Sequence, residues 1–291
     1  MAGLEIRELH PALGAEVIGL EPSVPLDDET VRRLREAFDA RSVLVFRGLD
    51  IDNEFQRYLT YTLVGADVPA PDSDEAQRSG PMISNREEGG AAPYGRLLFH
   101  CDTMWAETPH PNLSLYGLRL SEPTVPTMFV SMGYGWDTLP DDLRARVKGL
   151  SARHGHDNYY PNRGGDDDVV DSYFDEAISV VRPVAYAHPR TGRTLLYVSQ
   201  QVTMEIVGLP EAESNELLEE LYEHLYAPEQ ILQHDWRERD LVIWDNIAAQ
   251  HARGNVDLEG PERTLRKVFG PAGSEVARPA APTYSKVASR G

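Results

Sequence analysis

The residues with the clearest chemical potential are a histidine and an aspartate, His100 and Asp102, at the end of the apolar run 97–99. On an extended strand, residues two positions apart point to the same face, so both side chains can face one cavity while Cys101 points away. An imidazole and a carboxylate on one side are two of the three ligands of the facial triad that holds Fe(II) in non-haem oxygenases. The spacing therefore predicts a metal centre that a distant histidine completes.

The candidate for this third ligand is His251, which follows a predicted strand over 240–245. Residues at strand ends often carry functional sites. Two histidines and one carboxylate leave three positions of an octahedral metal open, enough for a 2-oxo acid and O2. Arg263 and Arg266 follow, and a guanidinium on a strand beside the metal can clamp a carboxylate with two parallel hydrogen bonds.

The elements that must position these residues are mostly short strands. Apolar and alternating runs predict strands over 4–9, 15–20, 42–48, 113–118, 127–131, 240–245 and 264–269, with a weak strand signal over 82–85 and a hairpin formed by 180–188 and 193–199. Helical spacing predicts helices that begin near residue 27 and over 53–64, 139–149 and 211–226. The pattern predicts a mainly β fold with added helices, a barrel or double sheet and not a doubly wound α/β fold.

The chain is expected to form one domain over residues 1–271. Within it, the polar segment 65–96, punctuated by Pro and Gly, is predicted to be an active-site lid, with a mobile surface loop as the alternative. Together with the 158–171 stretch, this segment is expected to determine specificity. The tail over 272–291, rich in Ala, Pro and Ser, is expected to be loosely ordered.

Composition limits the partners and the compartment. The chain has 28 Lys and Arg against 47 Asp and Glu, a formal net charge of −19, which argues against nucleic acid and anionic membranes as partners. No apolar run approaches the ~20 residues of a membrane span. With one cysteine and no signal-peptide pattern at its beginning, the chain is expected to be cytoplasmic. The sequence leaves open whether the chain forms a homo-oligomer.

Other chemistry-bearing motifs are weaker. His154, His156 and Asp157 have the types of a second metal site but no downstream partner set, so surface or substrate-loop residues are the favoured interpretation. The acidic run 166–168 lacks the spacing of a calcium loop. Candidate substrate contacts, each with plain packing as the alternative, are Tyr94, Arg96, Trp105, Tyr134, Tyr159 and Tyr160.

An ordered set of motifs resembles the taurine dioxygenase-like (TauD/TfdA) family of Fe(II)- and 2-oxoglutarate-dependent dioxygenases. The set is His100-x-Asp102, Glu107-Thr108-Pro109, Thr127, Trp244-Asp245-Asn246 with His251, and an arginine about a dozen residues further on. The resemblance extends over residues 4–269. It implies a double-stranded β-helix, the jelly roll also found in cupins, with Fe(II), 2-oxoglutarate and O2.

The resemblance also implies roles for single residues. His100, Asp102 and His251 match the iron ligands, and Thr127 and Arg263 match the residues that hold the side carboxylate of 2-oxoglutarate. The neighbouring residue Arg266 keeps the choice of anchoring arginine open. Lys267 stands where the taurine-oxidising member has a second arginine that holds the sulfonate, which argues against a taurine substrate.

Relatives that halogenate have Ala or Gly at the position of Asp102, so this carboxylate implies oxygenation or desaturation instead. The segment Tyr94-Gly95-Arg96 does not match the substrate residues of the taurine enzyme. Arg96, Arg266 and Lys267 remain as cations that favour an anionic substrate.

We therefore predict an enzyme that oxidises a small organic molecule while converting 2-oxoglutarate to succinate and CO2, and the cations named above favour an anionic group on that molecule. Two alternatives remain open: a jelly-roll protein that binds a metal or ligand without turnover, and a cupin-type dioxygenase that does not use 2-oxoglutarate. The substrate itself is not encoded in any recognisable motif.

Overall fold

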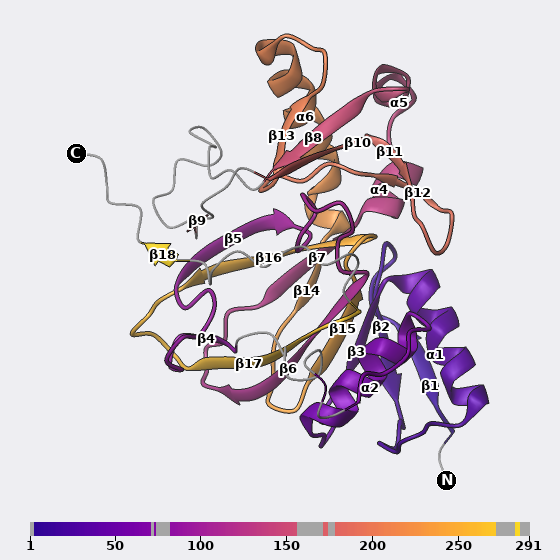
Figure 1. Cartoon of the computed structure of the whole chain (residues 1–291), viewed down its shortest axis with the longest axis vertical. Coiled ribbons are helices and arrows are strands. Elements are labelled where there is room, and N and C mark those ends of the chain that lie inside the picture. Colours follow the sequence, from indigo (N-terminus) through magenta and orange to yellow (C-terminus); the bar gives the residue numbers. More distant parts are fainter. Residues whose placement is uncertain are drawn as a thin grey trace.

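Two facing sheets form the centre of the protein, as the computed structural model in Figure 1 shows. The structure describes residues 3–70, 73, 82–155, 171–173, 178–271 and 283–285, and for 171–173 and 283–285 only the backbone. The larger sheet has the order β1-β2-β3-β15-β6-β17-β4, and the smaller sheet has the order β14-β7-β16-β5. All of their pairings are antiparallel except that of β2 with β3.

The strands of the larger sheet are β1 (Glu5–Glu8), β2 (Ala15–Ile18), β3 (Val43–Phe46), β4 (Ile83–Ser84), β6 (Asn112–Leu120), β15 (Leu241–Asp245) and β17 (Arg263–Phe269). Those of the smaller sheet are β5 (Gly95–His100), β7 (Thr127–Ser131), β14 (Leu232–His234) and β16 (Ala249–Val256). This is the expected jelly roll, a mainly β fold with added helices, although the two sheets do not close into a barrel.

Apolar side chains from both sheets fill the space between them. Val43, Leu113 and Val242 of the larger sheet pack in one cluster with Phe129 and Trp244. Ridged, close-packed layers of this kind hold two sheets about 10 Å apart and give the inner faces a fixed geometry. Inward-facing polar residues in such a layer are therefore held rigidly.

Two helices, α1 (Asp28–Arg41) and α2 (Asn53–Leu63), cover the outer face of the larger sheet. The Asp27 carboxylate accepts the N–H of Thr30 at 2.9 Å and caps the first turn of α1. Because β3 is buried by these helices on one side and by the second sheet on the other, all four of its residues are buried. This explains its continuous apolar sequence.

A third layer lies above the smaller sheet in Figure 1. It contains the sheet β10-β8-β13, the hairpin β11-β12 and three helices. Their bounds are β8 (Ser151–Gly155), β10 (Ser179–Pro183), β11 (Ala185–Ala187), β12 (Thr194–Leu196), β13 (Thr203–Ile206), α4 (Met132–Asp137), α5 (Asp141–Val147) and α6 (Glu211–Leu225), followed by a short 3-10 helix, η1 (Pro228–Gln230). Leucines 217, 218, 221 and 225 form the buried face of α6, as their spacing predicts.

The structure differs from the sequence prediction in several elements. The predicted hairpin of 180–188 with 193–199 is divided, because β10 pairs with β8 and only β11 pairs with β12. Pro183 ends β10, and proline has no N–H to continue a ladder. Helix α4 was missed, since its sequence contains two glycines in six residues. His251 lies inside β16, which was not predicted as a strand.

The predicted lid over 65–96 is described only in part. Its residues 83–84 form β4, which pairs with β17, and residue 95 begins β5, whereas 71, 72 and 74–81 lie outside the described residues. Within the predicted tail, β18 (Thr283–Ser285) pairs with β9 (Asp171–Tyr173). The lid function and the domain bounds therefore stay predictions.

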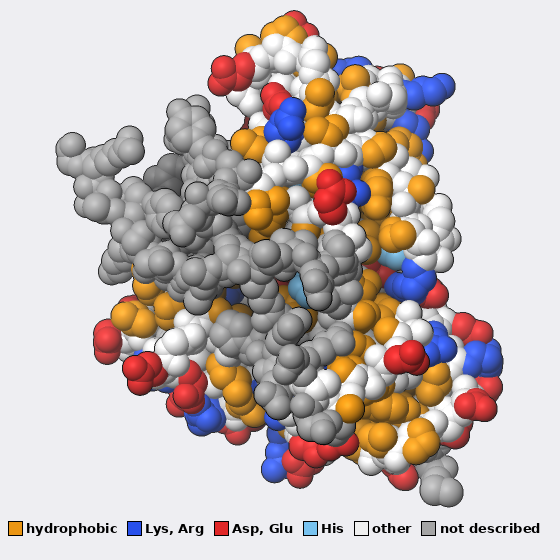
Figure 2. Space-filling view, viewed as in Figure 1, with side chains coloured by type: hydrophobic (Ala, Val, Ile, Leu, Met, Phe, Trp, Pro, Cys, Tyr) orange, Lys and Arg blue, Asp and Glu red, His pale blue; other side chains and the backbone are white. Residues whose placement is uncertain are grey.

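Charges of both signs are interspersed over the described part of the face in Figure 2. No helix among the described residues is long and apolar enough to cross a membrane.

Candidate active site

The two histidines and the aspartate of the predicted triad meet where β5 and β16 pair. His100, the last residue of β5, is the register partner of His251 on β16. Nε2 of His100 lies 3.3 Å from Oδ1 of Asp102, and Nε2 of His251 lies 3.8 Å from the same oxygen. The three side chains each offer a ligand atom within 4.8 Å of the others, which is the spacing that one metal ion requires.

Asp102 reaches this position by a route that the strand argument did not predict. The strand ends at His100, and Asp102 lies in the following turn. The side chain of Asn246 holds it there: its Oδ1 accepts the N–H of Asp102 at 2.9 Å, and its Nδ2 donates to the carbonyl of Asp102 at 2.8 Å. His100 and Asp102 do point to one site, as predicted. However, the hydrogen bonds with Asn246, and not strand alternation, place Asp102 there.

The protonation of these groups fits a divalent cation. Nδ1 of His100 donates to the carbonyl of Leu98 at 2.7 Å, so the lone pair of Nε2 faces Asp102. Burial, together with neighbouring His100, lowers the pKa of His251 well below its ordinary value and keeps it neutral. Burial would raise the pKa of Asp102, but the Lys267 ammonium holds it well below its usual range.

Lys267 faces the same centre from the opposite sheet. Its ammonium makes an ion pair with Oδ2 of Asp102 and lies 4.5 Å from the ring centroid of Phe269. Lys267 is 13% exposed at its side chain, so this cation is held in a largely dry site. The centre thus contains one carboxylate and one ammonium beside two imidazoles.

Thr127 and Arg263 form a second polar group near the triad. Thr127 is the register partner of Arg253 on β16, two positions from the pair that contains His251, so its side chain lies on the face of the triad. Nη2 of Arg263 donates to Oγ1 of Thr127 at 3.3 Å, and the indole N–H of Trp236 donates to the same oxygen at 2.9 Å. Because both N–H groups donate to this oxygen, the threonine hydroxyl hydrogen is left to donate to an acceptor.

Arg263 is a buried cation. It is 4% exposed, and in the described part of the chain it makes no ion pair with an acidic side chain. Burial, and secondarily the charge of Arg253, lowers the pKa of Arg263 well below its ordinary value. An anion bound beside Thr127 would offset this cost.

Arg266 does not belong to this group, which corrects its prediction as a cosubstrate residue. It lies three residues from Arg263 on β17 and points to the other face. Its guanidinium donates to Gln56 of α2 at 2.7 Å and to the carbonyl of Asp52 at 2.9 Å, and it stacks over Tyr116 at 4.7 Å.

The predicted substrate residues at the start of β5 are half-buried. The carbonyl of Tyr94 accepts a hydrogen bond from Nη2 of Arg253 at 3.1 Å, and Arg96 lies on β5. Cys101 is fully buried, and burial raises the pKa of its thiol, as expected of a small packing residue. His156, Asp157, the acidic run 166–168, Tyr159 and Tyr160 lie outside the described residues.

Sequence reasoning quoted Asn246 and Asp245 only as motif residues and missed their roles. It also missed Trp236 and the buried Arg253, whose guanidinium donates to three backbone carbonyls. Strand periodicity could have indicated Arg253, because it lies two positions from His251 and must point inward with it.

A jelly roll with two histidines and a carboxylate on one inner face defines a non-haem, metal-dependent oxygenase. The chain belongs to the taurine catabolism dioxygenase TauD, TfdA family, whose model matches residues 5–269.

Two relatives and one solved structure illustrate this membership. Pentalenolactone F synthase of Streptomyces avermitilis is 29% identical, over 88% of this chain and 90% of the relative. The alpha-ketoglutarate-dependent 2,4-dichlorophenoxyacetate dioxygenase of Cupriavidus pinatubonensis is 29% identical, over 89% and 94%. The structure of AAD-2 in complex with Mn(II) and N-oxalylglycine has a TM-score of 0.74 and 25% identity, covering 92% of this chain and 97% of AAD-2.

The protein is therefore an Fe(II)- and 2-oxoglutarate-dependent dioxygenase that oxidises a small organic molecule. Bound Fe(II) supplies, with 2-oxoglutarate and O2, the oxidising power that no side chain has. The two alternatives, a binding protein without turnover and a cupin-type dioxygenase with another oxidant, are not supported by these relatives.

Proposed function

We propose that His100, Asp102 and His251 bind Fe(II), and that Arg263 with Thr127 binds the side carboxylate of 2-oxoglutarate. The observation that supports the second role best is the buried charge of Arg263, which has no acidic partner in the described part of the chain. A guanidinium can meet a carboxylate with two parallel hydrogen bonds, and the Thr127 hydroxyl offers a third.

The substrate of this reaction is a small organic anion, with Lys267 as its recognition group. Lys267 lies at the metal centre and carries a charge that Asp102 alone neutralises in the described contacts. When a metal binds one oxygen of Asp102, its positive charge offsets that of the carboxylate and weakens the ion pair with Lys267. The ammonium can then pair with a carboxylate or sulfate of the substrate. The 2,4-dichlorophenoxyacetate named for one relative is such an anion.

An ammonium differs from the arginine that the resemblance places here. It is a compact point charge with three donors and no fork, so it does not select planar carboxylates over tetrahedral sulfates. The arrangement therefore accommodates either a carboxylate or a sulfate group on the substrate.

The one cysteine, Cys101, is buried and free, which fits a protein that works in a reducing, cytoplasmic compartment.

The experiment measures succinate formed from 2-oxoglutarate with Fe(II) and a panel of carboxylates, sulfates and their neutral esters or alcohols. We expect the anions alone to stimulate turnover in the wild-type protein and Asp102→Ala to abolish it. Lys267→Met should raise KM for the stimulating anion about 30-fold or more, since removing one member of a desolvated charge pair costs about 2 kcal/mol or more.

The matched control is Arg119→Met, which removes an exposed cation that pairs with Glu87 and Glu262 on the outer surface. It should leave KM unchanged. Stimulation by neutral compounds that Lys267→Met does not affect would contradict the proposed substrate class, and full activity of Asp102→Ala would contradict the proposed ligand set.

A further inference from the structure

A buried carboxylate closes the turn that leads from β15 to β16. Asp245, the last residue of β15, is 2% exposed. Its Oδ1 accepts the backbone N–H groups of Ile247 and Ala248, each at 3.0 Å. The carboxylate thereby fixes the backbone of the turn 246–248, as the side chain of an Asx turn does.

This turn positions two of the three proposed metal ligands. It contains Asn246, whose amide holds Asp102 at its N–H and its carbonyl. It also leads directly into β16, which begins at Ala249 and carries His251. A displacement of the Asp245 carboxylate would therefore move both ligands.

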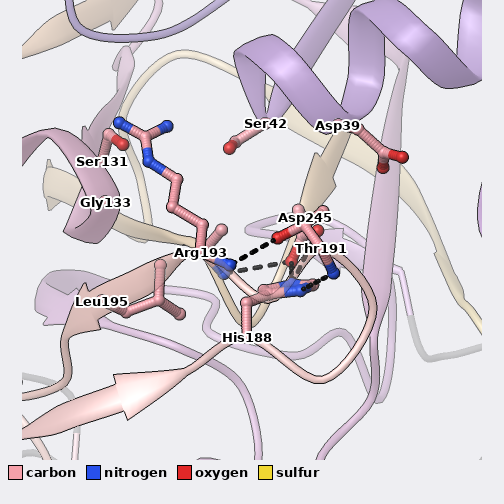
Figure 3. Close-up of a pocket in the computed structure, with 10 residues that line it drawn as sticks. Asp39, Ser42, Ser131, Gly133, His188, Thr191, Arg193, Leu195 and Asp245 are labelled. Carbon is pink, nitrogen blue, oxygen red and sulfur yellow. Dashed lines mark hydrogen bonds and ion pairs between the residues drawn. The ribbon is translucent and has the colours of Figure 1, made fainter.

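His188 holds Asp245 from the loop between β11 and β12. Figure 3 shows the imidazole of His188 directed at Asp245, with Thr191 of the same loop beside it. Nδ1 of His188 accepts the N–H groups of Arg190 at 3.2 Å and Thr191 at 3.1 Å, so Nε2 carries the proton and donates to Asp245 at 3.1 Å. The imidazole has one tautomer because the loop backbone determines it.

Arg190 completes the group. Its guanidinium contacts Oδ2 of Asp245 and also makes an ion pair with Asp39 of α1. Burial would raise the pKa of Asp245, but the hydrogen bond from His188 and the Arg190 charge hold it below its usual range. An ionised Asp245 accepts the N–H groups of the turn more strongly than a neutral acid would.

We propose that His188 is a positioning residue for the metal centre, which acts through Asp245 and Asn246 and does not touch the metal. The inference rests on the proposed ligand set. It connects the β11–β12 loop of the third layer to a site formed by the two main sheets, through His188, Asp245 and Asn246, which are all buried. Partners that orient metal ligands in this way typically change metal affinity by 10- to 100-fold when they are removed.

The test is calorimetric titration of the metal-free protein with Mn(II), in the wild type and in His188→Ala, His188→Asn and His188→Gln. The alanine and asparagine variants lose the donor that reaches Asp245, and we expect the dissociation constant of Mn(II) to rise about 10- to 100-fold. Glutamine places an amide N–H at nearly the reach of Nε2, so His188→Gln should bind Mn(II) within about threefold of wild type. His188→Asn serves where His188→Ala does not fold.

The control is His224→Ala, which removes a hydrogen-bonded histidine that joins α6 to the carbonyl of Gly135. Its Mn(II) affinity should equal that of wild type. Wild-type affinity in a folded alanine or asparagine variant would overturn the inference, as would equal weakening in the glutamine or His224 variants. Asp102→Ala separates this failure from that of the metal centre: if Asp102→Ala also binds Mn(II) like wild type, the proposed ligand set is wrong.

Discussion

Arg263 and Arg266 show how strongly the role of a residue depends on the face to which it points. Arg263 is buried beside Thr127, whereas Arg266 crosses the outer surface of the larger sheet to α2. We expect Arg263→Ala to raise the dissociation constant of 2-oxoglutarate about 30-fold or more, because a buried charged hydrogen bond typically contributes about 2–5 kcal/mol.

Arg266→Ala is the matched control for this prediction. It removes an equal charge three residues away and should change 2-oxoglutarate binding less than about threefold. Both constants come from anaerobic titration of the Fe(II)-loaded protein. Equal effects of the two substitutions would mean that the anchor has been assigned to the wrong arginine.

The sequence identified the chemistry of these residues but not their direction. Alternation on a strand states that Arg263 and Arg266 point to opposite faces. Which face is inward depends on the register of β17 with β6, where Arg263 pairs with Leu120, and no local pattern encodes that register. For the triad, the types and order of His100, Asp102 and His251 predicted the ligands, whereas the pairing of β5 with β16 that brings them together was not predicted.

At the scale of elements, the β5–β16 pair joins two proposed ligands although its ladder is irregular. The register shifts on both sides of Arg253, so backbone pairing alone is incomplete there. The Arg253 guanidinium donates to the carbonyls of Ala92, Tyr94 and Gly95 at 2.7, 3.1 and 2.7 Å and replaces the missing backbone donors. A single side chain thus fastens the beginning of β5 to β16.

We therefore expect Arg253→Met to lower the free energy of unfolding by about 3 kcal/mol or more, since buried carbonyls without donors cost about 1–3 kcal/mol each. Urea denaturation measures this change. Arg32→Met, which removes an exposed arginine paired with Glu29 and Glu36 on α1, should leave the stability nearly unchanged. A loss no larger than that of Arg32→Met would show that the ladder, and not the guanidinium, holds β5.

The sequence predicted only some of the strands. Most strands of the two main sheets were recognisable because each is a continuous apolar run or alternates, although β14 and β16 were missed. Strands β8, β13 and β16 were not predicted, since polar residues that work by long-range contacts interrupt them: Thr203 of β13 meets His154 of β8 at 3.0 Å. Partners 49 residues apart leave no local signal.

At the scale of the whole molecule, buried neutral histidines make the stability depend on pH. His154 in β8 and His234 in β14 are 0% and 2% exposed. Burial lowers the pKa of each to about 3, with the charge of Arg182 adding to the effect at His154 and that of Arg47 at His234. In the unfolded chain a histidine has a pKa of about 6.5.

The direction of the effect follows from proton counts. Between about pH 6.5 and 3 the unfolded chain binds a proton at each histidine that the folded chain does not. The stabilisation is therefore complete above pH 6.5 and is lost as the pH falls, by ~1.4 kcal/mol per pH unit for each histidine. Carboxylates with lowered pKa, such as Asp102 and Asp245, add to the loss only below about pH 4.

Urea denaturation at several values between pH 7 and 5 isolates the contribution of one histidine. His154→Gln should be less stable than wild type at pH 7, because the amide fills the site poorly, yet its stability should fall less steeply on acidification, by about one proton's slope. Thr203→Val removes the hydrogen-bond partner but keeps the imidazole, so it should be destabilised at every pH with the wild-type slope. Parallel curves for wild type and His154→Gln would show that the ring binds equal numbers of protons in the folded and the unfolded protein, and the acid sensitivity would then have to come from other groups.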